Sequence, residues 1–423
     1  MIDRSTDQTV PEVTSADPEA PASRVTELTR GLDRALGFVA GLSFASNLIV
    51  GAMLPILPLF AVAVGASPRE LALIVSVSAV ATAGGLMVGG FATERFGPRR
   101  LLPAGFAFYG IATLLTSIAG SVAPILTWRL VAGLGSGAYI VGERLYVRQV
   151  ADRTRLAFAN GVLQTAASAG LIIGPVLGGA VADASDLRTP IVAVGIAGVV
   201  MAVVSMLLPA RRRPDSADTP PASDAPVHLD RLGLSVLLLA EMALVAGYGS
   251  FITTFAPFAA DVRRWSTTEI GIAFSLFALG NLIAAPWIGA AADKWGRSRV
   301  GAVATLPITV FAVALLFPIS TAILYLLVLG AGAGVAGFTA SWFATLGAAT
   351  GGPQGGRAFG IVTSISSLGI VVGALLAGQL WEALDIRDGM AVTVVAMVLA
   401  GVFMALYGDR PRVPRPMLDP EPA

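Results

Sequence analysis

Long apolar stretches, separated by short polar breaks, run along almost the whole chain. A helix needs about 20 mainly apolar residues to cross a lipid bilayer, and twelve stretches of the sequence reach that length. They cover residues 36–62, 69–91, 100–120, 123–146, 157–181, 190–209, 232–258, 267–291, 300–318, 321–346, 357–381 and 388–408. The pattern therefore predicts an all-α membrane protein with twelve transmembrane helices.

The longest polar break, residues 209–231, is rich in Pro, Asp, Ser and Arg and leaves six spans on either side. Such a composition favours a flexible linker. We expect an N-terminal six-helix bundle over residues 34–209, a linker over 210–231 and a C-terminal six-helix bundle over 232–408. The polar ends, residues 1–33 and 409–423, are predicted to be tails, the first of them disordered.

The two halves of the chain repeat at a constant offset of 199 residues. The shift superposes prolines, acidic residues and glycines from the first span to the eleventh. The matched pairs are Pro58 with Pro257, Glu70 with Glu269, Gly90 with Gly289, Glu94 with Asp293, Gly97 with Gly296, Arg100 with Arg299, Gly133 with Gly332, Gly135 with Gly334, Gly161 with Gly360, Gly170 with Gly369, Gly174 with Gly373 and Gly179 with Gly378. We expect two pseudo-symmetric bundles with a substrate path at their interface.

Composition narrows the classes of function. The chain is 55% hydrophobic and 13% charged, whereas soluble domains carry roughly 25% charge, so most of it should lie in a bilayer. The net charge of +1 argues against nucleic acid as a partner. The chain has no cysteine and its single histidine, His228, lies in the linker, so we expect no metal and no cofactor. The sequence contains neither a Walker-type motif for ATP nor an enzyme constellation.

Basic residues predict the orientation, because loops on the cytoplasmic side carry an excess of Lys and Arg. With the N-terminus inside, 22 basic residues lie on the cytoplasmic side and five on the other. Both termini are therefore predicted to be cytoplasmic. The preference for Arg over Lys, with abundant Ala and Gly, indicates a GC-rich bacterial genome, so we expect the bacterial cytoplasmic membrane as the location. We also expect the chain to be a monomer.

A charged motif follows the second span, "GGFATERFGPRRLL" at 89–102, and returns after the eighth as "GAAADKWGRSRV" at 289–300. Glu94 follows a helix C-terminus, where the macrodipole disfavours an anion. It should therefore contact Arg95, Arg99 or Arg100, or a helix N-terminus of the other half, as a latch that forms in one conformation and breaks in another. A solvated loop is the alternative. The predicted latch residues are Gly90, Glu94, Arg95, Gly97, Arg99, Arg100, Asp293, Lys294, Gly296 and Arg299.

The fifth span contains residues that are unfavourable in a helix, in "SAGLIIGPVLGG" at 168–179. Gly170, Gly174 and Gly178 recur at every fourth position and so share one helix face, with Gly179 beside them. A face without side chains allows a neighbouring helix to approach its backbone. Pro175 removes a hydrogen bond and should bend the span. We expect a bent helix sealed tightly against a neighbour.

These motifs resemble those of the major facilitator superfamily, whose signature between spans two and three is glycine, acid, basic, glycine and a basic pair. Here Glu94 replaces the usual aspartate and Pro98 interrupts the basic run. The resemblance covers the whole chain and implies alternating access between two bundles. The fifth-span glycines with Pro175 are similar to the motif of the superfamily's antiporters, in particular drug:proton exporters, which symporters generally lack.

Candidate residues for coupling and substrate binding lie within the spans. Glu241 is the only carboxylate that we place well inside a span, with Tyr248 seven residues on and on the same face. Arg129 begins a fourth-span pattern similar to the family's arginine and spaced glycines, although Ala132 replaces the expected glutamine. An arginine at mid-bilayer costs about 2.5–3.5 kcal/mol, so it should face a polar cavity unless it reaches the outer headgroups. Asn47 and Asn281 are further candidates for the cavity.

Glu143 lies near the end of the fourth span, between arginines, and we expect it to form a structural ion pair with Arg144 or Arg148. The favoured function is secondary active export of small organic molecules, such as drugs or metabolites, by antiport with protons. A proton-coupled uptake symporter for a sugar or another small solute is the alternative. A membrane sensor is a third reading, but the tails and linker are short for a sensing domain.

Overall fold

The computed structural model describes residues 20–151, 155–209, 231–350 and 356–408, and the regular secondary structure of these residues is entirely helical. The predicted linker and most of both predicted tails lie outside the described residues, so the calls on those segments stay predictions. The first half contains α1 (Ala20–Ala63), α2 (Pro68–Phe96), α3 (Pro98–Ser117), α4 (Val122–Val150), α5 (Leu156–Ala184) and α6 (Arg188–Ser205). The second contains α7 (Arg231–Asp261), α8 (Thr267–Trp295), α9 (Arg297–Leu315), α10 (Thr321–Ala349), α11 (Gly356–Ser366), α12 (Gly369–Ala383) and α13 (Ile386–Tyr407).

Every predicted span has its helix, with two differences. Helix α1 begins at Ala20, inside the segment that the sequence analysis assigned to the polar tail. Among the described residues, eleven helical segments are long and apolar enough to cross a membrane. Helix α3, with two arginines in its first turn, is outside that set. It packs between α4 and α6, as a span would, and so completes the twelve predicted spans.

The second difference is a break in the eleventh span, between α11 and α12. The hydroxyls of Ser366 and Ser367 both donate to the carbonyl of Thr363, at 3.0 and 2.8 Å. Such local bonds compete with the helical ladder. The backbone N–H of Leu368 then donates to Ile365, three residues back, at 3.1 Å. The span is therefore interrupted by one tight turn, which its fifth-span counterpart lacks.

The helix contacts of the first half recur in the second. Helix α1 packs on α5, α2 on α4, and α3 on both α4 and α6; correspondingly, α7 packs on α12, α8 on α10, and α9 on both α10 and α13. Each half also has its own hydrophobic core, one formed by residues between 35 and 208 and the other by residues between 237 and 404. A bundle with a complete core moves as a unit, which is what a rocking mechanism needs.

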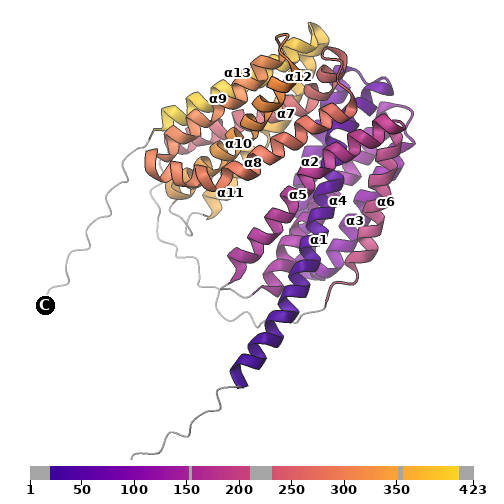
Figure 1. The fold of residues 1–423 in the computed structure, drawn as a ribbon, viewed down its shortest axis with the longest axis vertical. Coiled ribbons are helices and arrows are strands. Elements are labelled where there is room, and N and C mark those ends of the chain that lie inside the picture. The colour runs from indigo at the N-terminus through magenta and orange to yellow at the C-terminus, as the bar shows by residue number, and fades with distance from the viewer. Residues whose placement is uncertain (1–19, 152–154, 210–230, 351–355, 409–423) are drawn as a thin grey trace, which may run out of the picture.

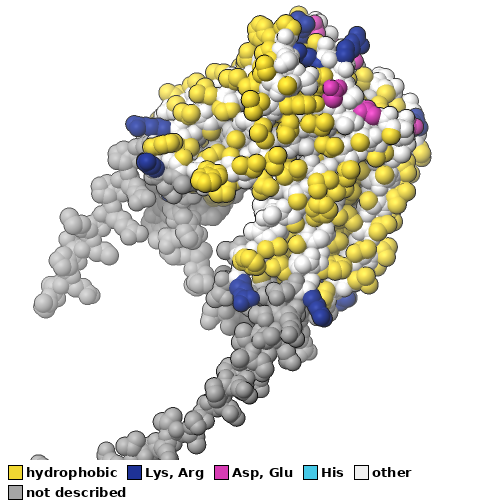
Figure 2. Space-filling view, in the orientation of Figure 1, with side chains coloured by type: hydrophobic (Ala, Val, Ile, Leu, Met, Phe, Trp, Pro, Cys, Tyr) yellow, Lys and Arg dark blue, Asp and Glu magenta, His cyan; other side chains and the backbone are white. Residues whose placement is uncertain are grey.

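The two bundles meet mainly through α5 with α8 and through α2 with α12. We call the end at which α6 stops and α7 starts the linker side, and the opposite end the far side. Figure 1 shows the bundles in contact towards the far side and diverging towards the linker side, where the N-terminal end of α1 projects. Figure 2 shows hydrophobic side chains over the flanks and charged side chains mainly at the two ends. The described conformation is closed on the far side.

Candidate functional site

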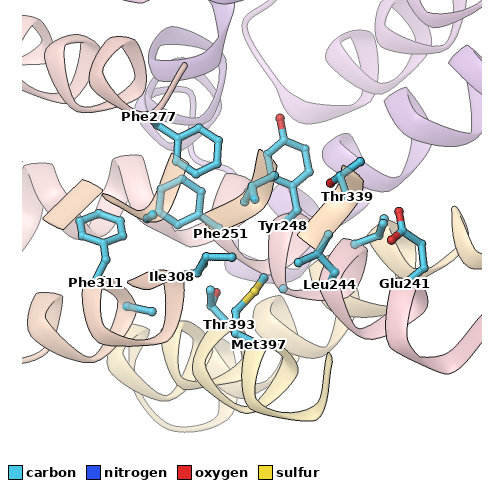
Figure 3. Close-up of a pocket in the computed structure, with 15 residues that line it drawn as sticks. Glu241, Leu244, Tyr248, Phe251, Phe277, Ile308, Phe311, Thr339, Thr393 and Met397 are labelled. Carbon is cyan, nitrogen blue, oxygen red and sulfur yellow. The ribbon is translucent and has the colours of Figure 1, made fainter. Parts of the chain in front are cut away.

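An aromatic cavity of about 290 Å³ lies within the second bundle, among α7, α8, α9, α10 and α13. Phe251, Phe277 and Phe311 form one side of it, as Figure 3 shows. The rings of Phe251 and Phe311 are 6.1 Å apart edge to face, and those of Phe251 and Phe277 are stacked at 6.4 Å. Such a lining favours an apolar, preferably aromatic, ligand.

Among the described residues that line this cavity, Glu241 alone has a carboxyl group. Its Oε2 atom is buried and has no hydrogen-bond partner among the described residues. A buried carboxylate without a partner is costly, so a proton or a cationic ligand would stabilise this group. Tyr248 lies two helical turns further along α7, and in Figure 3 its hydroxyl and the Glu241 carboxyl point to the same side. The predicted shared face of these two residues is confirmed.

Tyr248 also lines a second cavity, of about 400 Å³, that belongs mainly to the first bundle. Its walls are residues of α1, α2, α3 and α4, completed by Tyr248, Ile252 and Ile370 from the second bundle. Tyr248 is 39% exposed, so a ligand in either cavity could contact its side chain. The two cavities therefore meet at one tyrosine, on the surface where the bundles face each other.

Arg129 lies at the wall of this second cavity, on α4. It is 6% exposed, and its Nη2 atom donates to Thr113 Oγ1 at 3.0 Å. Its Nε atom is buried without a partner among the described residues. The alternative in which Arg129 reaches the outer headgroups is therefore wrong, because its side chain points into the bundle. The donor left without a partner could bind an anionic or polar group in the cavity.

Glu143 does not form the ion pair that its neighbours in sequence suggested. It is 5% exposed, and its Oε1 atom accepts a hydrogen bond from Ser46 of α1 at 3.2 Å. Arg144 and Arg148 are exposed, on other faces of α4. The signal was present in the sequence: Arg129, Ser136 and Glu143 recur at every seventh position and so share one face of the helix.

The two asparagines contribute less than predicted to the described cavities. Asn47 Nδ2 donates to the carbonyl of Ser43, in its own helix, at 2.8 Å. Asn281 is partly exposed on α8, where its backbone packs against Gly332 of α10. Neither is among the residues that line the two cavities described above.

The glycine face of α5 packs against α1. A Cβ atom on Gly170, Gly174 or Gly178 would lie closer than 3.0 Å to the α1 backbone, at Phe44, Leu48 and Ala52 respectively. Real Cβ atoms essentially never approach so closely, so only glycine fits there. Gly179 makes an equally close approach to Thr267 of α8, in the other bundle. Pro175 is inside α5, and its carbonyl faces Gly271 of α8. One helix thus seals both a contact within its bundle and a contact between bundles.

The predicted latch residues lie at the linker side. Glu94, Arg95, Arg99 and Arg100 are exposed, and Glu94 has no ion pair within the described part of the chain. Gly97 and Gly296 have φ of 78° and 93°, so each ends one helix and begins the next in a turn that other residues rarely adopt. Gly90 and the exposed Lys294 and Arg299 lie near these turns, and the Asp293 side chain is outside the described residues. The latch stays a prediction for a conformation with the linker side closed.

The profile of the Major Facilitator Superfamily matches residues 37–240 and 237–423. The chain is 28% identical over 165 residues to an uncharacterised transporter of this type from Methanocaldococcus jannaschii, covering 39% of this chain and 43% of that protein. It is 22% identical over 230 residues to quinolone resistance protein NorA of Staphylococcus aureus, covering 53% and 58%. The chain thus spans about half the length of these curated relatives.

Two crystal structures have a similar fold. The nucleoside transporter NupG gives a TM-score of 0.73 at 13% identity, covering 88% of this chain and 99% of that chain. A bacterial homolog of the human lysosomal transporter Spinster, inward-facing and unoccupied, gives a TM-score of 0.72 at 17% identity, covering 90% and 97%. The family match, the twelve spans and the two bundles lead to one conclusion: this chain is a multi-pass membrane protein of the Major Facilitator Superfamily, a family of transporters and not of enzymes.

Proposed function

We propose that this protein exports small organic molecules, such as drugs or metabolites, in exchange for protons. The two bundles rock about the cavities on either side of Tyr248 and expose them first to one side of the membrane and then to the other. The small organic substrate and protons are its partners, and the chain acts as a monomer in the lipid bilayer.

The observation that carries the proposal is Glu241, whose Oε2 atom has no hydrogen-bond partner among the described residues, on the wall of a largely apolar, aromatic cavity. A neutral, protonated Glu241 is stable in that cavity when it is empty. A ligand with an aromatic body and a positive charge would stabilise the ionised form instead. Proton and substrate would therefore exclude each other at one group, which is the requirement for antiport.

The lining also separates the favoured function from sugar uptake. A sugar carries many hydroxyls, and binding it leaves buried polar groups unsatisfied unless the site supplies matching donors and acceptors. Besides Glu241, the described residues that bring polar side chains to the aromatic cavity are Tyr248, Thr339 and Thr393. The similarity to a protein named for quinolone resistance also supports export of aromatic compounds.

The direction of export follows from the proposed orientation. The excess of basic residues assigns the linker side to the cytoplasm of a bacterium, with both termini there. The described conformation, closed on the far side, would then be the one that loads substrate from the cytoplasm. Protons entering from outside would drive the return of Glu241 to its protonated form.

Transport by purified protein in proteoliposomes tests the proposal, with ethidium as an aromatic cation and an imposed pH gradient as the driving force. We expect Glu241→Gln to lower gradient-driven ethidium flux at least about 100-fold, because a neutral amide cannot release a proton. The matched control is Asp261→Asn, which removes an exposed carboxylate at the end of the same helix. Equal flux for Glu241→Gln and the wild type would disprove Glu241 as the exchange site.

A further inference from the structure

Four acidic residues at the far side repeat with the offset of the two halves. Asp183 and Glu382 end the fifth and eleventh spans, and Asp186 and Asp385 follow in the next loops; each pair is separated by 199 residues. None of them is part of the motifs at the linker side or of the cavity walls. Their hydrogen bonds divide them into two classes, one between the bundles and one within each bundle.

Asp183 and Glu382 each bind the first turn of a helix in the opposite bundle. The two oxygens of Asp183 accept from the backbone N–H groups of Thr267 and Thr268 of α8, at 3.0 and 2.8 Å. Glu382 Oε2 accepts from the backbone N–H of Arg69 in α2 at 3.2 Å, and its Oε1 is 3.3 Å from Arg69 Nη1. The first bundle therefore caps a helix of the second, and the second caps a helix of the first.

Both helices have the same need for an acceptor. The first turn of a helix leaves backbone N–H groups without partners and carries a partial positive charge. Ser67 with Glu70, and Ser266 with Glu269, form capping boxes that satisfy the third N–H of α2 and α8. The first two positions stay open to an external acceptor. Because Pro68 has no N–H, α2 offers one backbone donor where α8 offers two, and the Arg69 side chain supplies the second bond to Glu382.

A glycine of one bundle closely approaches the helix start of the other bundle at each of these two contacts. A Cβ atom on Gly179 would lie within 3.0 Å of Thr267 and Thr268, and one on Gly378 within 3.0 Å of Pro68 and Ala72. These glycines lie one turn before Asp183 and Glu382 on the same helices. The far side can therefore open only if both caps are broken, since each acid moves with one bundle and its donors move with the other.

We infer that Asp183 and Glu382 are a reciprocal pair of positioning residues that hold the far side closed during the transport cycle. We call this pair the cross-cap. Its release is the step that gives a bound substrate access to the far side. The inference rests on alternating access, which is part of the proposed function, but it is independent of the coupling ion, the substrate and the role of Glu241.

The acids of the second class provide matched controls. Asp186 accepts from the backbone N–H groups of Arg188 and Thr189 at the start of α6, at 2.9 and 2.7 Å. Asp385 accepts from the backbone N–H of Arg387 at the start of α13 at 3.4 Å. Each of these three bonds joins two residues of the same bundle, so none of them changes when the bundles separate. Removing these acids perturbs a helix start at the same depth without perturbing the contact between the bundles.

Distances between spin labels on the full-length protein in lipid nanodiscs test the inference, and the cysteine-free chain allows labels at chosen sites. One pair, Gly120→Cys with Pro318→Cys, reports on the far side, because each residue is exposed in a far-side loop of a different bundle. A second pair, Arg148→Cys with Ala348→Cys, reports in the same way on the linker side. Opening should lengthen the first distance and shorten the second.

We expect Asp183→Ala and Glu382→Ala each to raise the far-side-open population about fivefold, as for loss of a helix cap, and the double variant to raise it about 25-fold. Asp183→Asn should have a smaller effect, because its amide oxygen still accepts a hydrogen bond. Asp186→Ala and Asp385→Ala should leave both distances unchanged. Thermal unfolding in detergent confirms that each variant is folded before labelling.

Two outcomes overturn the cross-cap: distances in the double variant that match those of the wild type, or an equal shift in the two control variants. Glu241→Gln measured with the same labels separates this inference from the proposed function. If Glu241→Gln transports normally while the double variant opens the far side, proton coupling at Glu241 is disproved and the cross-cap is supported. If Glu241→Gln stops transport while the double variant keeps wild-type distances, proton coupling at Glu241 is supported and the cross-cap is disproved.

Discussion

Two carboxyl groups lie well inside the spans of the described structure, one in each bundle, and they occupy reciprocal positions. Glu143 of α4 faces hydroxyls of α1, and its repeat-related residue in α10 is Trp342, whose Nε1 donates to the carbonyl of Leu237 in α7 at 2.8 Å. In the second bundle the carboxyl, Glu241, is instead on α7. Each bundle thus places one acid at the crossing of its first and fourth spans, contributed by different helices.

The sequence predicted Glu241 as a functional residue because it lies in an apolar stretch with no basic residue nearby that could pair with it. It misassigned Glu143 because arginines next to it in sequence suggested an ion pair. Consecutive residues of a helix point in different directions, so Arg144 projects outwards while Glu143 projects inwards. The hydroxyl that binds Glu143 comes from another helix, and such a contact cannot be read from local spacing.

Removing the partner of Glu143 tests this assignment. We expect Ser46→Ala to lower the free energy of unfolding by about 1–3 kcal/mol, because Glu143 Oε1 would stay buried without its donor. Thermal unfolding in detergent measures the change. Ser235→Ala is the control: its exposed hydroxyl bonds only to its own helix, and the change should stay within about 0.5 kcal/mol. Equal losses in the two variants would contradict the assignment.

Replacing Arg129 should lower transport but not stability, in contrast to Ser46→Ala. The Arg129 guanidinium is buried and its Nε atom has no partner among the described residues, so an apolar residue of similar length relieves its desolvation. We expect Arg129→Met to unfold at the same temperature as the wild type or a higher one, while transport falls at least about tenfold. A variant that loses stability and transport together would show that Arg129 is a structural residue.

At the scale of elements, the spacing of glycines predicted a close helix contact for the fifth span, but it did not identify the partner. Four-residue spacing defines a bare face of α5, and any helix with a small surface would fit it. The structure places α1 there, and it places α8 against the adjacent Gly179. The break between α11 and α12 was also not predicted, because serines and threonines are common in helices and their back-bonding depends on rotamer.

The close contact of α5 with α1 predicts a large effect of one methyl group. A Cβ on Gly174 would overlap the carbonyl of Leu48, so we expect Gly174→Ala to lower the free energy of unfolding by about 2–3 kcal/mol and to impair transport. Gly161→Ala, in the same helix, has open space around its Cβ. It should stabilise the protein by up to about 1 kcal/mol through helix propensity. Melting temperatures test this: Gly174→Ala should melt below the wild type and Gly161→Ala at or above it. Equal melting temperatures for the two variants would contradict the close contact.

At the scale of the whole molecule, the spans, the central division and the duplication were all predicted from hydropathy and the constant offset. The conformation was not, because closure depends on contacts between residues far apart in sequence. The acids of the far side look like ordinary loop residues until they are compared across the repeat. Applied to the helix ends, the same offset that revealed the duplication relates Asp183 to Glu382 in the sequence alone.

The linker side makes the complementary prediction. Glu94 is exposed and makes no ion pair among the described residues, so we expect Glu94→Gln to leave unfolding temperature and far-side closure unchanged. If the latch forms when the linker side closes, the variant should nevertheless slow transport about two- to fivefold. Arg144→Gln, which removes an exposed charge on the same side outside the motif, is the control. Wild-type rates for Glu94→Gln would contradict the latch.

The reciprocity of the far-side contacts bears on how the chain arose. When surface one of a bundle binds surface two of its neighbour, and surface two binds surface one, the arrangement is that of an isologous dimer. A six-helix ancestor carrying one acid and one open helix start could have assembled as a symmetric pair with both contacts already in place. Fusion of the two gene copies would then have kept both contacts of the cross-cap, while the cavities of the two bundles diverged in sequence.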